Sequence, residues 1–201
     1  MSAARPQLSQ DFVAAHKRRR MIDAMSELCA ERGYEAAKIA DVVRHAHVAR
    51  KTLYDNFTGK EDLFLAAFDT ALADAEVEIA AACAGLPPTA WEARTEAALR
   101  ALLGFIAAHP AAARLALVEA PTAGPAAAAR YDAAIDGFIA RLRDAAPTAP
   151  GRPTTLEEAL VGGTVWIMHR QVRRGDIAKA PALLPELTEF IVSPYRSVGK
   201  R

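Results

Sequence analysis

Apolar residues recur at three- and four-residue intervals along almost the whole chain, which is the spacing of one buried face of an α-helix. Glycine and proline punctuate the periodic stretches, and β-branched runs, which strands favour, are few. The pattern therefore predicts an all-α protein of about nine helices. We expect the helices to cover residues 16–32 (or from residue 11), 38–46, 49–57, 58–84, 89–109, 110–120, 125–146, 155–174 and 182–198.

Several helix ends carry their own signals. A Thr followed three residues later by a Glu, the capping-box pattern, occurs at residues 58–61, 89–92 and 155–158. In such a box the hydroxyl accepts a hydrogen bond from the Glu amide, and the carboxylate reaches back to the Thr amide. Gly33 is expected to stop the first helix in the left-handed conformation, and Pro194 is expected to kink the last one.

Residues 33–63 predict two short helices joined by a tight turn, followed by the start of a longer helix. The second short helix surrounds one apolar residue, Leu53, with basic and polar ones, which suits insertion into the major groove of DNA. In that docking geometry Arg50, Lys51 and Thr52, in the first turn, face the base edges. Arg50 is expected to pair with guanine, and Thr52 to contact thymine or a phosphate.

The charge distribution also indicates a DNA-binding head. The 201 residues carry a net charge of only +1, but residues 1–60 hold 11 Lys/Arg against 7 Asp/Glu, whereas the remainder hold 14 against 17. A basic head on an acidic body fits phosphate binding at one end of the molecule. The consecutive Arg18, Arg19 and Arg20 predict either a phosphate-binding helix start or a mobile basic arm.

This N-terminal stretch resembles the TetR family of bacterial transcriptional regulators. The resemblance is carried by Gly33-Tyr34, Ile39-x-x-Val42-Val43, Ala46-His47-Val48-Ala49, Leu53-Tyr54-x-x-Phe57 and Lys60-Glu61-x-Leu63. Where the family has a turn glycine this chain has His47, which we expect at positive φ. Residues 114–119, 160–163, 183–187 and 194–195 are similar to a common C-terminal domain of the same family, more loosely.

The resemblance implies how the chain is organised and what it binds. It predicts a helix-turn-helix DNA-binding domain at residues 1–62 and a ligand-sensing, dimerising helical bundle at residues 63–201. Its partners are expected to be double-stranded operator DNA, a second copy of the chain in a homodimer, and an unknown hydrophobic small-molecule effector. Tyr54 resembles the family tyrosine that contacts phosphate, and the further backbone contacts are expected from Asn56, Lys60, Lys38 and Arg44.

In the body, the family implies a ligand pocket and a four-helix dimer interface. The aromatic and histidine side chains expected to converge on the pocket are Trp91, Phe105, His109, Tyr131, Phe138, Trp166 and His169; ordinary core packing is the alternative for each of them. The residues expected at the dimer interface are Leu160, Gly163, Leu187, Phe190 and Ile191, with packing inside the chain as the alternative. Gly163 inside a helix suggests a close approach between helices.

The composition argues against several other classes of protein. Cys29 and Cys83 are too few for a disulfide scaffold or a thiolate metal cage, so we expect reduced core thiols. No apolar run approaches the roughly 20 residues of a membrane span, and the N-terminus lacks a signal-peptide centre, so a cytoplasmic protein is expected. No cofactor and no metal site are expected.

The interpretation is a ligand-responsive repressor that a hydrophobic small molecule releases from a palindromic operator. Two alternatives remain open at this point. One is a regulator of the same kind that works without a small molecule, through a protein partner or as an activator. The other is a helical enzyme, although the sequence shows no nucleophile elbow, phosphate-cradling glycine loop or recognisable pair of carboxylates.

Overall fold

The computed structural model describes residues 4–147 and 153–196, and within these ranges the chain is helical without any strand, as the sequence predicts. Short segments of π-helix and 3₁₀-helix interrupt the α-helices. In chain order the elements are α1 (Ala4–Arg32), α2 (Ile39–His45), α3 (Arg50–Tyr54), α4 (Lys60–Cys83), α5 (Trp91–Ala108), α6 (Pro110–Arg114), η1 (Leu115–Glu119), η2 (Ala120–Thr122), α7 (Pro125–Ala145), α8 (Leu156–Arg173), η3 (Ile177–Leu183) and α9 (Leu184–Arg196).

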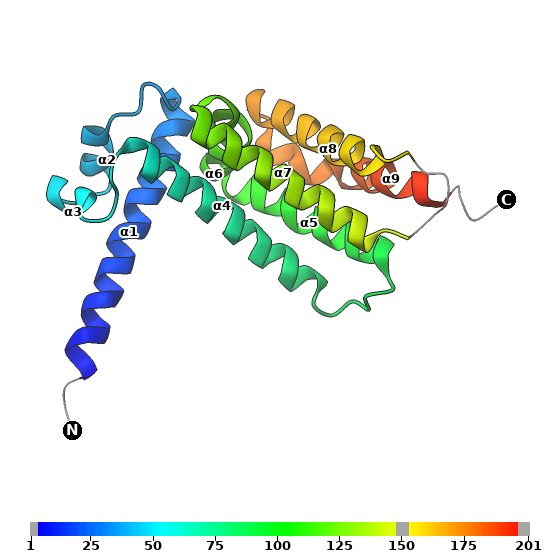
Figure 1. Ribbon diagram of the computed structural model, residues 1–201, viewed down its shortest axis with the longest axis horizontal. Helices are drawn as coiled ribbons and strands as arrows, with labels where there is room; N and C mark the ends of the chain where they lie inside the picture. The colour runs from blue at the N-terminus through cyan, green and yellow to red at the C-terminus, as the bar shows by residue number, and fades with distance from the viewer. Residues whose placement is uncertain (1–3, 148–152, 197–201) are drawn as a thin grey trace.

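The molecule has a small head and a long body (Figure 1). The head consists of α1, α2 and α3, and the body is a bundle in which α5, α7, α8 and α9 run alongside one another. α4 begins in the head and continues along the body, where it packs against α5 and α7. α6 and η1 pack against α1 as well, so two separate parts of the body touch the head.

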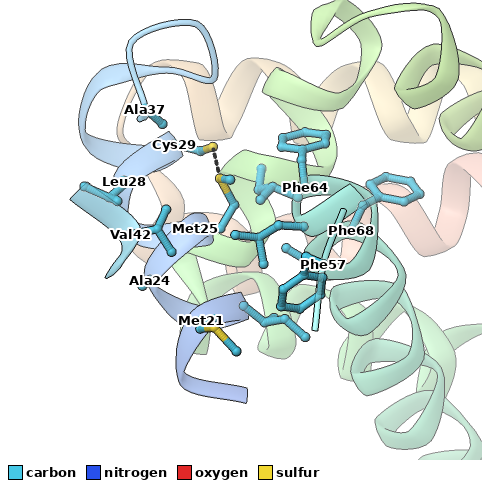
Figure 2. Packing of buried hydrophobic residues seen from close by; sticks show 14 of the residues in the cluster. Met21, Ala24, Met25, Leu28, Cys29, Ala37, Val42, Phe57, Phe64 and Phe68 are labelled. Carbon is cyan, nitrogen blue, oxygen red and sulfur yellow. Dashed lines mark hydrogen bonds between the residues drawn. The ribbon is translucent and has the colours of Figure 1, made fainter. Parts of the chain in front are cut away.

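The head is held together by an apolar core that continues into α4 (Figure 2). Leu53 and Phe57, on and just after α3, are buried there, as are Leu63, Phe64 and Phe68 of α4. Complete burial of such side chains stabilises each by about 1.5–3 kcal/mol. α3 is therefore fixed to α4 by packing. The core continues without a break across residue 62, the predicted boundary between the two domains.

The two cysteines are buried free thiols, as the sequence predicts. The Cys29 thiol donates to the Met25 sulfur over 3.6 Å (Figure 2). Burial, with a smaller contribution from the nearby Glu119 carboxylate, raises the pKa of Cys29 to about 12. The thiol therefore stays protonated and unreactive as part of the head core.

The helix that begins at Pro110 is shorter than the sequence predicts, because it changes character after Arg114. It continues as the π-helical turn η1 and the 3₁₀ turn η2 rather than reaching residue 120 as an α-helix. Pro121 has no N–H to offer the carbonyl of Leu117 four residues earlier. That carbonyl instead accepts a hydrogen bond from His169 Nδ1 of α8 over 2.8 Å. The irregular turn is thereby built into the body.

None of the three predicted capping boxes forms, and the prediction was wrong in each case. Before α4, the Thr58 amide and hydroxyl both donate to the Asp62 carboxylate, over 2.8 and 3.2 Å, and Gly59 occupies the N-cap position. Before α5, the Glu92 carboxylate pairs with Arg196 of α9 over 2.8 Å. Before α5, a tertiary partner thus takes the carboxylate that the local pattern assigned to a cap.

Two helix ends differ from expectation in smaller ways. α1 begins at Ala4, because residues 4–15 hold no glycine and Pro6 falls in the first turn, where proline is tolerated. α9 starts at Leu184 and runs through Pro194 to Arg196; the expected end at residue 198 lies outside the described residues.

In the described ranges, only the pair formed by α5 and residues 110–122, bent by 106°, has the length and apolar composition of a membrane span, and no single helix does.

Candidate DNA-binding surface and effector cavity

α3 presents a polar and basic surface over one buried anchor. Leu53 is completely buried, whereas Arg50 and Lys51 are exposed, Thr52 is half-buried, and Tyr54 is 47% exposed. The Arg50 guanidinium lies 5.7 Å from the centre of the Tyr54 ring and within 3.5 Å of its hydroxyl oxygen. The ring therefore holds the guanidinium along the helix, which reduces the entropy that Arg50 loses when it binds a base edge.

The turn between α2 and α3 is fixed from α1. His47 has φ +50°, the left-handed conformation expected for it. Arg20 donates to the Ala46 carbonyl and, over 3.1 Å, to the His47 carbonyl. These hydrogen bonds satisfy carbonyls at the end of α2 and brace the strained turn.

The other two arginines of the basic run are exposed and contact neighbouring parts of the chain. The Arg18 guanidinium lies 4.4 Å from the centre of the Phe57 ring and donates to the Asn56 carbonyl over 3.3 Å. Arg19 pairs with Asp23 and with Asp74 of α4, both over 2.9 Å. The run lies in the middle of α1, so it is neither a helix start nor a mobile arm, and all three side chains brace the head.

The remaining DNA-contact candidates surround α3. Lys60, the first residue of α4, places its ammonium 4.1 Å from the centre of the Tyr34 ring and donates to the Glu35 carbonyl over 3.2 Å. The Asn56 amide donates to the Thr52 carbonyl over 2.8 Å and so caps the end of α3. Lys38 and Arg44, at the two ends of α2, are exposed, and Arg44 pairs with Asp41 over 2.9 Å.

One contact between head and body was not predicted as such. Glu119, at the end of η1, accepts a hydrogen bond from the backbone amide of Tyr34 over 2.9 Å, and its other oxygen lies 3.7 Å from Arg114 Nε. Gly33 has φ +81° and is close enough that an added Cβ would lie 3.5 Å from the same carboxylate. Glu119 is the one acidic residue in the apolar run 115–120, and a largely buried carboxylate needs a partner. This was the sequence signal that could have predicted the contact.

The body contains a cavity of about 450 Å³. Its wall comes mainly from α4, α5 and α7, with contributions from α6 and α8. On α4 the lining runs from Phe68 to Cys83, which is roughly 22 Å at 1.5 Å per residue. Alanines at inward positions such as Ala71, Ala75 and Ala116 leave the space that larger side chains would fill.

The structure places four of the seven predicted pocket residues on this wall: Trp91, Phe105, Tyr131 and Phe138. The wall is otherwise almost wholly apolar. Burial, with a smaller effect of Asp132, raises the pKa of Tyr131, so its phenol stays neutral. The lining side chains with nitrogen or oxygen atoms are Trp91, Arg94, Thr95, Tyr131, Arg141 and Thr164.

His109, Trp166 and His169 do not line this cavity, so the structure does not bring them together with the other four predicted pocket residues. His109 is exposed, with Nε2 3.8 Å from a carboxylate oxygen of Glu78. His169 holds the Leu117 carbonyl and stacks on Trp166 with ring centres 5.5 Å apart. Trp166 is 58% exposed and lies in a separate surface groove between α7 and α8. Periodicity places a residue on a helix face without identifying which neighbour that face meets.

The predicted dimer residues divide into buried and accessible ones. Leu160, Leu187 and Ile191 are buried inside the chain, so the alternative of internal packing holds for them. At Gly163 an added Cβ would lie 3.1 Å from the Phe190 ring, which explains the glycine as a close approach of α8 and α9. Phe190 is 41% exposed, so apolar surface remains accessible beside the contact between α8 and α9.

The comparisons with known proteins agree with this geometry. Residues 21–67 match the family described as bacterial regulatory proteins, tetR family. A sequence search of curated proteins gives no significant match.

Solved structures share the fold over almost the whole chain. The fatty acid degradation regulator FadR of Bacillus halodurans has 18% identity and a TM-score of 0.79, with 90% of this chain and 96% of that chain covered. FadR of Bacillus subtilis, solved with stearoyl-CoA, has 18% identity, TM-score 0.74 and coverages of 87% and 97%. A TetR-like regulator of Rhodococcus sp. RHA1 has 21% identity, TM-score 0.66 and coverages of 92% and 97%.

The described residues fold as a helix-turn-helix head on a helical body, a fold that the chain shares with the regulators named above. Residues 21–67, which include most of the head, match the tetR family of bacterial regulatory proteins. This match favours a DNA-binding regulator over the enzyme alternative.

Proposed function

We propose that the chain is a homodimeric repressor that leaves a pseudo-palindromic operator when a hydrophobic small molecule fills the body cavity. The observation that carries the proposal is the combination of an exposed basic α3 with a mostly apolar cavity of about 450 Å³ in the same chain. Small-molecule sites commonly measure roughly 300–1,000 Å³ and have apolar walls with a few polar groups.

On the DNA side, we propose that Arg50, Lys51 and Thr52 read base edges while residues around them hold the phosphates. The phosphate contacts are assigned to Tyr54, Asn56, Lys60, Lys38 and Arg44. Two copies related by a twofold axis would place their α3 helices in successive major grooves of a palindromic site. The exposed Phe190 and Trp166 support a second copy as the neighbour of the side of the body formed by α8 and α9.

On the effector side, the shape and chemistry of the cavity favour a long, flexible apolar molecule. The lining follows α4 for roughly 22 Å, and most of the side chains along it are apolar. The B. subtilis FadR structure contains stearoyl-CoA, which supports a long-chain acyl compound as the ligand class. Burial of such a chain is favourable in proportion to the apolar area removed from water.

We propose that the effector acts through α4 and η1 together. Phe68 of α4 belongs both to the cavity wall and to the head core. Packing along α4 would therefore couple a DNA-binding domain at residues 1–62 to a sensing domain at residues 63–201. Ala116 and Leu117 also line the cavity, three and two residues before Glu119, which holds the Tyr34 amide. A ligand that prefers a displaced η1 shifts the population toward heads that no longer match the operator.

Replacing Glu119 with alanine is expected to reduce this coupling. The Tyr34 amide would lose its acceptor, at a cost of about 1–3 kcal/mol, and the movement of η1 would no longer reach the head directly. We expect ligand-free DNA affinity to stay within about threefold, while the effect of the ligand falls from the usual range of about 5- to 150-fold toward none. Fluorescence anisotropy of labelled DNA with and without palmitoyl-CoA measures both.

Glu119→Gln is the matched control, because its amide oxygen can still accept from Tyr34. It should keep most of the ligand response. Equal responses of the alanine variant and the unmodified protein would show that the signal does not pass through this contact.

The function itself is tested with the DNA upstream of the chain's own gene and of its divergent neighbour. We expect nanomolar binding that weakens steeply with salt and is relieved by palmitoyl-CoA. Binding that no long-chain compound changes would favour the regulator without a small-molecule effector. Absence of sequence-selective binding to these and to randomised sequences would contradict the proposal.

A further inference from the structure

We propose that the cavity takes a long-chain ligand with an anionic end, and that Arg94 binds this end where α4 gives way to α5. The inference rests on the proposed function and adds the charge and the orientation of the effector. Among the residues that the structure describes, Arg94 and Arg141 are the only charged side chains on the cavity wall. They lie toward the same end of the cavity, with Cys83, Trp91 and Ala145, whereas Phe68, Ala116 and Tyr131 lie toward the head.

The two arginines differ in what balances their charge. Arg141 pairs with the carboxylate of Glu76 and lies 5.1 Å from the centre of the Phe138 ring. Arg94 has only neutral acceptors: its Nη1 donates to the Cys83 carbonyl over 3.0 Å and to the Leu86 carbonyl over 3.1 Å. Across residues 4–147 and 153–196, no carboxylate forms an ion pair with Arg94.

A guanidinium in an apolar wall without a counter-charge is costly, and a ligand anion would remove that cost. The guanidinium carries five N–H donors, and the two hydrogen bonds to the Cys83 and Leu86 carbonyls use only Nη1. The remaining donors, on Nε and Nη2, have the planar geometry that binds a carboxylate or phosphate through two hydrogen bonds. Thr95, also on the wall, offers a hydroxyl beside them.

This assignment fixes the direction of the ligand. With the anion at Arg94, the apolar tail extends along α4 toward Ala116 and Leu117, where the wall carries no charge. The end of the tail then meets the segment that leads to Glu119 and the head. Tail length, rather than the anionic group, would decide how far η1 is displaced.

A purely structural role is the competing explanation, because Arg94 ties the last turn of α4 to α5. Arg94→Gln separates the two roles, since glutamine keeps N–H donors for those carbonyls but carries no charge. The probes are palmitate, palmitoyl-CoA and 1-hexadecanol, which share the tail and differ in the end group. Binding is followed by the fluorescence of Trp91, in a Trp166→Phe background that leaves Trp91 as the only tryptophan.

For the parent protein, at least one of the two anionic probes should bind about tenfold or more tighter than 1-hexadecanol. Arg94→Gln should weaken that probe by about 10- to 100-fold and leave 1-hexadecanol unchanged. The anionic probe that responds identifies the source of the charge, carboxylate or coenzyme A. Arg94→Lys should recover part of the loss, and Arg100→Gln, an exposed arginine of the same helix paired with Glu96, should change nothing.

Two results would overturn the assignment. Equal weakening of the alcohol and the anions would make Arg94 a structural clamp, and anion binding that ignores Arg94→Gln would place the charge elsewhere. Failure of all three probes to bind the parent protein would instead remove the long-chain effector, and the assignment of Arg94 with it.

Discussion

Arg50→Ala is expected to weaken binding to the cognate operator by about 1–3 kcal/mol per half-site, and therefore by about 2–6 kcal/mol in a dimer that uses both copies. Arg50 is exposed in the first turn of α3, and Tyr54 holds its guanidinium along the helix. Its loss removes an interaction with particular base pairs, so preference at those pairs should relax. Selection from randomised DNA, followed by anisotropy on the selected site, measures both effects.

Lys60→Ala is the control, because we assign Lys60 to a phosphate rather than a base. That variant should bind all sequences more weakly by a similar factor and flatten the dependence of affinity on salt. The stability of the head should be little affected by Arg50→Ala, since the anchor Leu53 is untouched. Unchanged affinity and unchanged preference in both variants would show that α3 does not face the DNA.

Ala75→Phe is expected to abolish the response to the effector while leaving the operator affinity within about twofold. Ala75 is 5% exposed on α4 and lies on the cavity wall, midway between Phe68 and Cys83. A phenyl ring there would occupy space that the ligand needs, and closely packed interiors cannot share it. We expect the affinity for palmitoyl-CoA to fall by about 100-fold or more, which thermal shift and calorimetry would detect.

Ala73→Phe, two residues away on the exposed face of α4, is the matched control and should bind the ligand normally. If Ala75→Phe still releases DNA on addition of palmitoyl-CoA at the same concentration as the unmodified protein, the cavity is not the effector site. Circular dichroism of both variants establishes that they remain folded.

Local patterns were enough to predict the head. Gly33 stops α1 at positive φ, His47 adopts the left-handed turn, and Leu53 anchors α3, because each of these outcomes depends on a few neighbouring residues. The all-α fold followed from helical periodicity for the same reason. These are features in which backbone preference and burial agree.

The contacts that join head to body could not be predicted in this way. Glu119 and Tyr34 are 85 residues apart, and nothing in either local sequence specifies the other. The capping box before α5 failed for a related reason, since Glu92 finds Arg196, 104 residues away, as a tertiary partner. Local propensity is a weak guide wherever a distant charge competes for the same group.

The cavity and the dimer side show a further limit of periodicity. An apolar helix face can meet a neighbouring helix, an empty space or a second chain, and the sequence spacing is the same in all three cases. Trp166 and Leu187 illustrate this: both fall on apolar stripes of α8 and α9, yet Trp166 is exposed and Leu187 is buried. The alanines of the cavity wall were an available signal, because small residues on facing helices leave room between them.

The most direct test of the whole account is a hydroxyl-radical footprint of the chain on its upstream DNA, without and with palmitoyl-CoA. Two protected half-sites are expected, with centres about 34–36 Å or a multiple apart, and both should disappear together when the ligand is added. A single unpaired protected site that the ligand leaves intact would contradict a dimer that carries two recognition helices under the control of the body cavity.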